Sequence, residues 1–173
     1  MRKIKNDELA RKNVDEFKSS AKIPVVVVLD NVRSMNNIGS VFRTADAFLI
    51  EAIYLCGITA QPPHREIEKT ALGATDSVSW KYFKTTDEAV QDLTTNSYEV
   101  IAIEQAEGGK LLDEFTIDRN KKYALVFGHE MMGVGEDVMN LVHSAIEIPQ
   151  SGTKHSLNIS VCAGIVLWEF FRS

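Results

Sequence analysis

Pro24-Val-Val-Val-Val-Leu29 is an unbroken run of aliphatic, mostly β-branched residues near the start of the chain. A strand of this composition is typical of a parallel sheet that helices cover on both faces. Outward from it, further strands are expected at residues 52–56, 77–83, 99–104, 123–127 and 145–148. Helices are expected at residues 38–49, 66–72, 86–95, 136–142 and 156–172. This alternation predicts an α/β fold with a mainly parallel sheet and helices on both faces.

The length and composition are those of one globular domain. The chain has 173 residues, of which 45% are apolar and 25% are charged, enough to bury a sound core. We expect a single domain over residues 1–173, in which residues 1–22 form a short charged helical arm with its helix from Asn6 to about Ser20. The net charge of −5 argues against a strong nonspecific grip on nucleic acid, although it permits a local basic patch.

Several features favour a cytoplasmic location with no membrane attachment. The first residues are highly charged and no apolar core follows them, so no signal peptide is expected. No apolar run approaches the length of about 20 residues that a membrane span needs. Cys56 and Cys162 lie in apolar surroundings and are expected to be reduced core residues.

The last expected helix, residues 156–172, has almost no polar face. A helix that is apolar all round must be buried all round, and a small domain offers few places to bury it. We therefore predict a homodimer with this helix in the interface. The alternative is a helix buried within one subunit.

Three polar, glycine-rich turns follow expected strands, at residues 37–43, 127–135 and 148–158. In an open α/β sheet, the loops that leave the carboxyl ends of the strands form the ligand crevice. The chain is therefore expected to be an enzyme or a nucleotide binder rather than a scaffold.

Taken one at a time, the sequence motifs argue against several classes of protein but identify none. The pair His129-Glu130 lacks the second histidine of a zinc protease, because position 133 is Gly. Neither a Walker-type phosphate loop nor a Gly-x-Gly-x-x-Gly motif is present, and the histidine spacing predicts no metal site. Glu130 itself is either a ligand of backbone amides or a site residue. Arg43 lies off the apolar stripe of its helix, where a solvated arginine is the simpler interpretation.

Ser156 and Asn158 stand where the last helix is expected to open. Both residue types cap helices, and a helix amino terminus also suits an anion. On their own they therefore leave capping and ligand binding open.

Taken together, the three segments resemble the motifs of one family. The matching residues are Asn37, Gly39, Arg43, Ala45, Ala47 and Phe48 in the first, Phe127, Gly128, Glu130 and Gly133 in the second, and Ile148, Pro149, Gly152, Ser156, Leu157, Asn158, Ser160, Ala163 and Gly164 in the third. Over about residues 24–172 the chain resembles the SpoU-type (TrmH-like) RNA 2′-O-ribose methyltransferases of the SPOUT superfamily. It departs from the family at His129, where Asn is usual, at Gly135, near which Ser is usual, and at Gln150, where Met is usual.

The resemblance implies an S-adenosylmethionine-dependent enzyme with a deep trefoil knot in its carboxyl-terminal part. It implies cofactor contacts at Ile103, Gly128, Ile148 and Leu157, with glycine at 128 and 152 leaving room for the cofactor. It also implies an RNA substrate, tRNA in preference to rRNA, and active sites that form across a homodimer.

The resemblance further assigns the catalytic residues, namely Arg43, Asn37, Glu130, Ser156 and Asn158. An arginine is a poor base because its pKa is above about 12. The hypothesis is that Arg43 binds RNA phosphate and stabilises the developing alkoxide, while Glu130 orients it. The alternatives are an RNA-binding relative without catalysis and a metabolic enzyme that binds a nucleotide.

Overall fold

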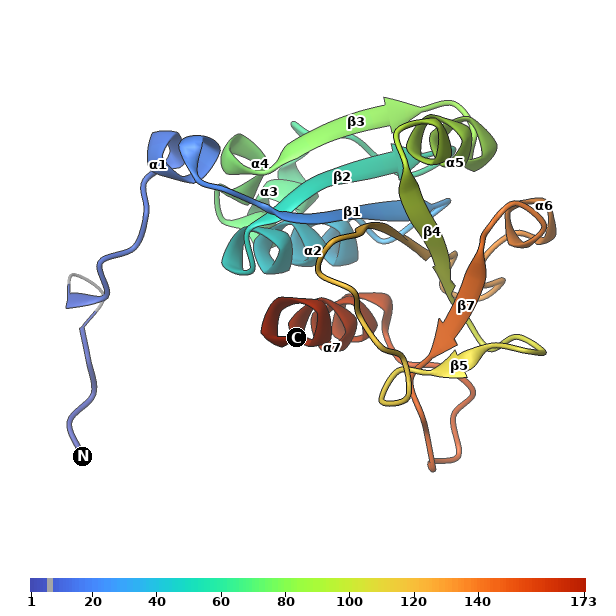
Figure 1. Cartoon of the computed structure of the whole chain (residues 1–173). Coiled ribbons are helices and arrows are strands. Elements are labelled where there is room, and N and C mark those ends of the chain that lie inside the picture. Colours follow the sequence, from blue (N-terminus) through green and yellow to red (C-terminus); the bar gives the residue numbers. More distant parts are fainter. Residues whose placement is uncertain (6–7) are drawn as a thin grey trace.

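The sheet positions everything else in this protein. The computed structural model describes residues 1–5 and 8–173, and in this part of the chain seven strands form one sheet in the order β3-β2-β1-β6-β4-β7-β5 (Figure 1). Their bounds are β1 Ile23–Asp30, β2 Ile50–Cys56, β3 Ser79–Phe83, β4 Tyr98–Ile103, β5 Lys110–Leu111, β6 Lys122–Phe127 and β7 Ser144–Glu147. Every pairing is parallel, so the predicted parallel α/β fold is confirmed.

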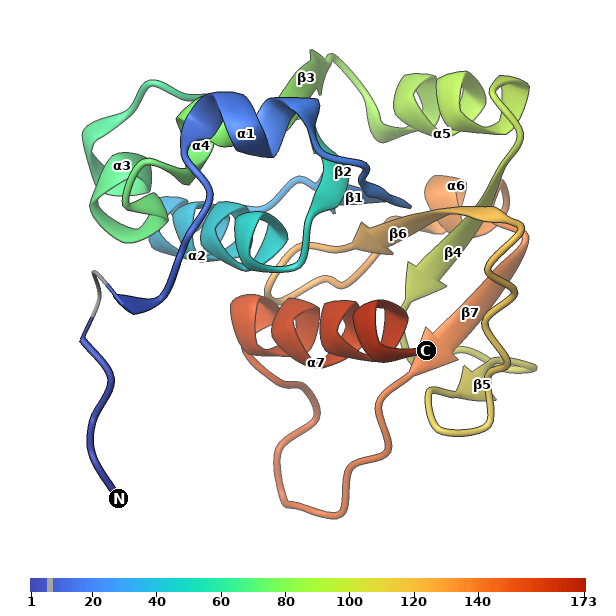
Figure 2. The same ribbon diagram turned by 60° about the vertical axis from the view of Figure 1, so that its left-hand side comes forward.

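Helices cover both faces of the sheet, as predicted. One face carries α1 Val14–Ser19, α2 Met35–Ala47, α3 Arg65–Ala71, α4 Ala74–Ser77 and α7 Ile159–Arg172; the other carries α5 Thr86–Thr95 and α6 Glu136–Met139 (Figure 2). Strand β1 shows the division directly, because Val25 and Val27 pack in the first core while Val26 and Val28 pack in the second. Successive side chains of a strand point to opposite faces, which explains why the valine run has no polar side.

Asp30 fastens the carboxyl end of β1 to the second face. Its side chain is 3% exposed, and it accepts hydrogen bonds from the Thr86 hydroxyl, the Asn31 side-chain amide at 2.8 Å and the backbone N–H of Gly135 at 3.0 Å. A buried carboxylate needs such donors to offset its desolvation. One side chain thereby holds the starts of α5 and α6 beside the end of β1.

The amino-terminal arm is less helical than predicted. The expected start at Asn6 lies outside the described residues, and the helix that follows runs only over Val14–Ser19. It begins there because Asn13 and Glu16 form a reciprocal capping box. Of its residues only Phe17 is buried, and the described charged residues that precede this helix are exposed.

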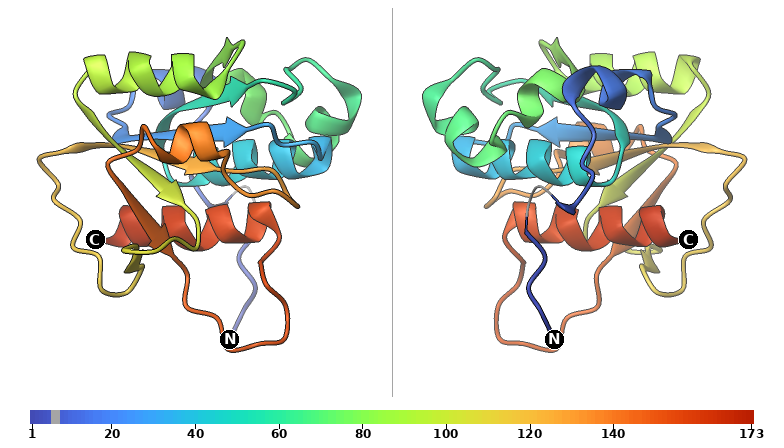
Figure 3. Two further views of the ribbon diagram at one scale, coloured as in Figure 1. Left: turned by 90° about the vertical axis from the view of Figure 1, so that its right-hand side faces the viewer. Right: turned by 90° about the vertical axis from the view of Figure 1, so that its left-hand side faces the viewer.

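Two helices near the glycine-rich turns begin at other residues than predicted. Helix α2 starts at Met35, with Ser34 as its cap, so Asn37, which directly precedes the expected helix at residues 38–49, lies inside the first turn. Helix α7 starts at Ile159 with Asn158 as its cap, so Ser156 precedes the helix. The segment 148–158 instead projects from the domain between β7 and α7 (Figure 3).

Helix α7 is not buried all round within one chain, which contradicts the alternative of a helix buried within one subunit and leaves the homodimer a prediction. Ile159, Ala163, Val166, Leu167 and Phe170 face the core. Four other apolar residues are exposed, by 51% for Val161, 39% for Ile165, 50% for Trp168 and 42% for Phe171. At spacings of four, three and three residues, these four lie on one side of the helix. They are called the α7 stripe below.

Helices α2 and α7 lie side by side and point the same way. Near their amino ends, Asn158 donates a hydrogen bond to Asn37 at 3.2 Å. At their carboxyl ends, Phe48 packs against Trp168 and Phe171, with ring centroids 5.8 and 5.1 Å apart. The first and third glycine-rich segments are therefore neighbours in space.

Candidate active site

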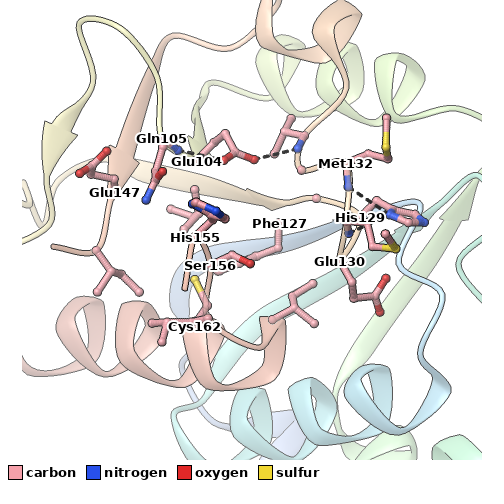
Figure 4. Close-up of a pocket in the computed structure, with 18 of the residues that line it drawn as sticks. Glu104, Gln105, Phe127, His129, Glu130, Met132, Glu147, His155, Ser156 and Cys162 are labelled. Atoms are coloured by element: carbon pink, nitrogen blue, oxygen red, sulfur yellow. Dashed lines mark hydrogen bonds between the residues drawn. The ribbon is translucent and has the colours of Figure 1, made fainter. Parts of the chain in front are cut away.

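A cavity of about 500 Å³ opens at the carboxyl ends of β4, β6 and β7, beside the start of α7 (Figure 4). Three stretches that are distant in sequence line it. The lining residues are Ile103, Glu104, Gln105, Phe127, Gly128, His129, Glu130, Met131, Met132, Gly133, Val134, Met139, Glu147, Ile148, Gln150, His155, Ser156, Leu157, Ile159 and Cys162. This edge of a parallel sheet is where ligands of open α/β folds bind.

All four residues predicted to contact a cofactor line this cavity, namely Ile103, Gly128, Ile148 and Leu157. They come from the ends of β4, β6 and β7 and from the segment before α7. The predicted site residues Glu130 and Ser156 line it as well. The fold thus brings together residues that are more than 50 positions apart, as Ile103 and Leu157 are.

The turn after β6 is tightly closed on itself. His129 and Gly133 exchange two backbone hydrogen bonds, each of 2.9 Å. A Cβ atom at Gly128 would overlap the backbone of Gly133 and Val134. Glycine is therefore required here by the turn itself, which adds a reason to the predicted room for a cofactor. Gly152 has no such neighbour, since nothing lies within 4 Å of a Cβ placed there.

His129 shapes the same turn through its side chain. Its Nδ1 atom accepts hydrogen bonds from the backbone N–H groups of Met131 at 3.1 Å and Met132 at 3.4 Å. The neutral ring must therefore carry its proton on Nε2. Met131 and Met132 are strongly exposed at the rim of the cavity. The histidine that departs from the family pattern thus acts as an acceptor, a role that an asparagine oxygen could also fill.

Glu130 fastens this turn to the start of α2. Its carboxylate accepts hydrogen bonds from the backbone N–H groups of Ser34 at 2.9 Å and Arg33 at 3.2 Å, and from the Asn37 side chain at 3.4 Å. Burial alone would raise the pKa of Glu130, but these bonds and one from its own backbone outweigh that effect and lower the pKa. Of the two interpretations of Glu130, a ligand of backbone amides is the one seen in this chain.

A line of hydrogen bonds then joins all three glycine-rich segments. Glu130 accepts from the Asn37 amide, and the Asn37 carbonyl oxygen accepts from Asn158 at 3.2 Å. The Asn158 oxygen in turn accepts from the N–H and the hydroxyl of Ser160 at 2.9 and 2.7 Å, capping α7. Asn158 therefore both caps a helix and reaches across to α2.

Arg43 lies outside this cluster within one chain. It is exposed on α2, six residues beyond Asn37 and so about 120° away around the helix axis. Among the described residues it makes no hydrogen bond or ion pair, and it does not line the cavity. The proposed orientation of Arg43 by Glu130 is therefore not formed in the isolated chain.

Sequence reasoning passed over two acidic residues of the cavity. Glu104 follows β4, and its carboxylate accepts hydrogen bonds from the backbone N–H groups of Val134 at 3.0 Å and Gln105 at 2.9 Å. The bond to Val134 connects the tight turn after β6 to the end of β4. Glu147 ends β7. The sequence did contain a signal for Glu104, because an acidic residue directly after a buried strand indicates a possible site residue.

The cavity carries an excess of negative charge. Its described lining includes the three carboxylates of Glu104, Glu130 and Glu147, and no lysine or arginine. Burial, with a smaller effect of Glu104, raises the pKa of the Cys162 thiol to about 11, so this thiol stays protonated at neutral pH. A cationic ligand suits such a cavity better than an anionic one.

Within residues 1–5 and 8–173, no three His, Cys, Asp or Glu side chains gather in a way that could hold a metal ion. The helices of the same residues include none with the length and apolar character needed to cross a membrane.

Comparisons with known proteins agree with this geometry. The family model of the SpoU rRNA Methylase family matches residues 24–168. The tRNA (guanosine(18)-2′-O)-methyltransferase of Thermus thermophilus is 29% identical over 165 residues, which cover 95% of this chain and 83% of that protein. The 23S rRNA (guanosine-2′-O-)-methyltransferase RlmB of Nitrosomonas europaea is 31% identical over 148 residues, 86% of this chain and 56% of that protein.

Solved structures show the same fold. The AdoMet-bound rRNA methyltransferase of Sinorhizobium meliloti superimposes with a TM-score of 0.78 and 29% identity, over 86% of this chain and 56% of that one. The present chain thus spans little more than half the length of the Nitrosomonas and Sinorhizobium proteins.

Proposed function

Because this chain belongs to the SpoU rRNA Methylase family, we propose that it transfers a methyl group from S-adenosylmethionine to a ribose 2′-hydroxyl of RNA. The observation that carries the proposal is the line Glu130–Asn37–Asn158, which ties the three family motifs together beside the cavity. We favour tRNA over rRNA as the substrate, because the Thermus tRNA enzyme matches nearly the whole chain.

The cavity suits S-adenosylmethionine in size and charge. Its volume of about 500 Å³ lies within the range of about 300–1,000 Å³ of small-molecule sites. The cofactor would supply an electrophilic methyl group on a positively charged sulfur. Ile103, Gly128, Ile148 and Leu157 would hold it, and the three carboxylates suit its charge. A nucleotide with two or three phosphates would be repelled, which argues against the nucleotide-binding metabolic enzyme.

The chain's own residues have to position and activate the attacking hydroxyl. Glu130 holds Asn37, and Asn37 and Asn158 together present side-chain amides near the cavity. These groups and Ser156 are suited to orient a ribose, because in-line attack requires the two reacting atoms to be held close together. An arginine would then stabilise the oxygen as it loses its proton.

We propose that this arginine is Arg43 of a second copy of the chain. Arg43 is exposed on α2, the helix that packs beside α7. The α7 stripe is apolar and 39–51% exposed in one chain, as expected of a homodimer interface. Two copies that meet on α2 and α7 would bring the arginine of each toward the cavity of the other.

The remaining features follow from the family resemblance. We propose that one domain, residues 1–173, carries the whole activity, and that its carboxyl-terminal segment is threaded into a deep trefoil knot. A tRNA substrate would place the protein in the cytoplasm.

Two experiments test the proposed function. Calorimetry of the purified protein is expected to detect binding of S-adenosylhomocysteine and no binding of NAD or ATP. Mass spectrometry of nucleosides from tRNA and rRNA, with and without the gene, is expected to show the loss of one 2′-O-methyl mark. The silent-relative alternative predicts cofactor binding without any missing mark, and the metabolic alternative predicts binding of NAD or ATP.

A further inference from the structure

The three carboxylates of the cavity are not equivalent. Glu104 is engaged by the N–H groups of Val134 and Gln105, and Glu130 by the start of α2. The carboxylate of Glu147 makes no hydrogen bond or ion pair with any described residue. Only the backbone of Glu147 is held, since its carbonyl oxygen accepts the N–H of Leu112 at 2.8 Å. Glu147 is thus the acidic group that remains available to a ligand.

Glu147 lies where its charge can act on a ligand in the cavity. Glu147 is half-buried, lines the cavity, and directly precedes Ile148, a proposed cofactor contact. A cofactor that fills the cavity and contacts Ile148 would therefore lie beside Glu147, and a partly buried pair of charges is screened less than an exposed pair. No lysine or arginine in the described lining neutralises the carboxylate.

We propose that Glu147 is a specificity-determining residue that makes the cavity prefer the cationic methyl donor to the neutral product. This inference rests on the proposed function. The sulfur of S-adenosylmethionine carries a methyl group and a positive charge, and the sulfur of S-adenosylhomocysteine carries neither, while the rest of the two molecules is the same. A nearby carboxylate therefore strengthens binding of the donor more than binding of the product, which favours exchange of product for fresh donor.

Calorimetry with three probes tests this inference on the full chain at low ionic strength. The probes are S-adenosylmethionine, S-adenosylhomocysteine and sinefungin, a stable analogue with an amine in place of the methylated sulfur. Glu147→Gln is expected to weaken binding of the two cationic probes by about five- to tenfold and that of S-adenosylhomocysteine by less than about twofold. Glu147→Asp, which keeps the charge, is expected to keep most of the preference.

Glu114→Gln is the matched control, because Glu114 is exposed and does not line the cavity. It should leave all three affinities unchanged. Equal weakening of all three probes by Glu147→Gln, or no weakening, overturns the inference while the proposed function stands. A wild-type protein that binds none of the three overturns both. If Glu147→Gln does not fold, loss of the preference in a folded Glu147→Asp variant also overturns the inference.

Discussion

At the scale of single residues, Glu130 shows how one carboxylate joins two motifs. We expect Glu130→Gln to lower the free energy of unfolding by about 1 kcal/mol, which is below the usual range of about 1.5–3 kcal/mol for hydrogen bonds to charged groups, because solvent partly screens this group. The lowered pKa of Glu130 means that its contribution is present above the ordinary carboxyl pKa of about 4.3 and is lost as the pH falls through the lower folded value.

Urea unfolding at pH 7 and pH 3 measures this contribution. The wild-type and Glu130→Gln proteins should differ at pH 7 and converge toward pH 3. Glu107→Gln, at an exposed position without a side-chain hydrogen bond among the described residues, should change little at either pH. An equal difference at both pH values would mean that the charge of Glu130 is not what stabilises the turn.

A second prediction at this scale concerns Gly128 and Gly152, which lie in the second and third glycine-rich segments. Gly128→Ala places a Cβ atom on the backbone of Gly133 and Val134, whereas Gly152→Ala meets only open space. We expect the first to lower the free energy of unfolding by about 2 kcal/mol or more and to weaken cofactor binding, and the second to stay within about 0.5 kcal/mol. Thermal unfolding and calorimetry of both variants test this. Equal effects would contradict it.

At the scale of elements, the α7 stripe makes the third prediction. Ile165→Glu puts a charge in the middle of the exposed apolar side of α7, and we expect it to convert a dimer into a folded monomer. Leu72→Glu is the matched control, because Leu72 is 65% exposed but lies on the other side of α2 from α7, at the end of α3. Light scattering after size exclusion measures the mass. A wild-type monomer, or a dimeric Ile165→Glu protein, would contradict the prediction.

Helix and strand types could be predicted from the sequence, but several boundaries could not. Two residues near the start of α2 can cap a helix, Ser34 and Asn37, and nothing local decides between them. Ser34 caps α2 because Glu130, almost a hundred residues later, holds the N–H of Ser34 and the side chain of Asn37. Strand β5 has two residues and depends on pairing with β7, so it leaves no pattern of its own.

At the scale of the whole molecule, a mixing experiment tests whether sites form across two chains. Arg43→Ala and Asn158→Ala are each expected to abolish methyl transfer. If Arg43 acts on the partner's cavity, a mixed dimer has one intact site, and an equal mixture should recover roughly a quarter of wild-type activity. Transfer of labelled methyl groups to tRNA measures it. An inactive mixture that demonstrably exchanges subunits would place Arg43 in its own chain's site.

The sequence predicted the cofactor-contacting residues of the candidate site better than its carboxylates, for a physical reason. The four expected cofactor residues line one cavity, because strand ends in a parallel sheet meet at one edge. The roles of Asp30, Glu104 and Glu147 were missed. A carboxylate's role depends on which N–H groups surround it, and those of Asp30 come from residues as distant as Gly135. The order of strands in the sheet decides such neighbours, and hydrophobic periodicity does not encode that order.

The exposed α7 stripe implies that the proposed activity depends on the concentration of the protein in the cell. If each reaction centre needs two chains, mass action governs how many centres exist. Below the dissociation constant of the pair, their number grows with the square of the protein concentration. Halving expression would then remove about three quarters of the centres rather than half. Modification of the target RNA would respond to the supply of this protein as a threshold, without any separate regulator.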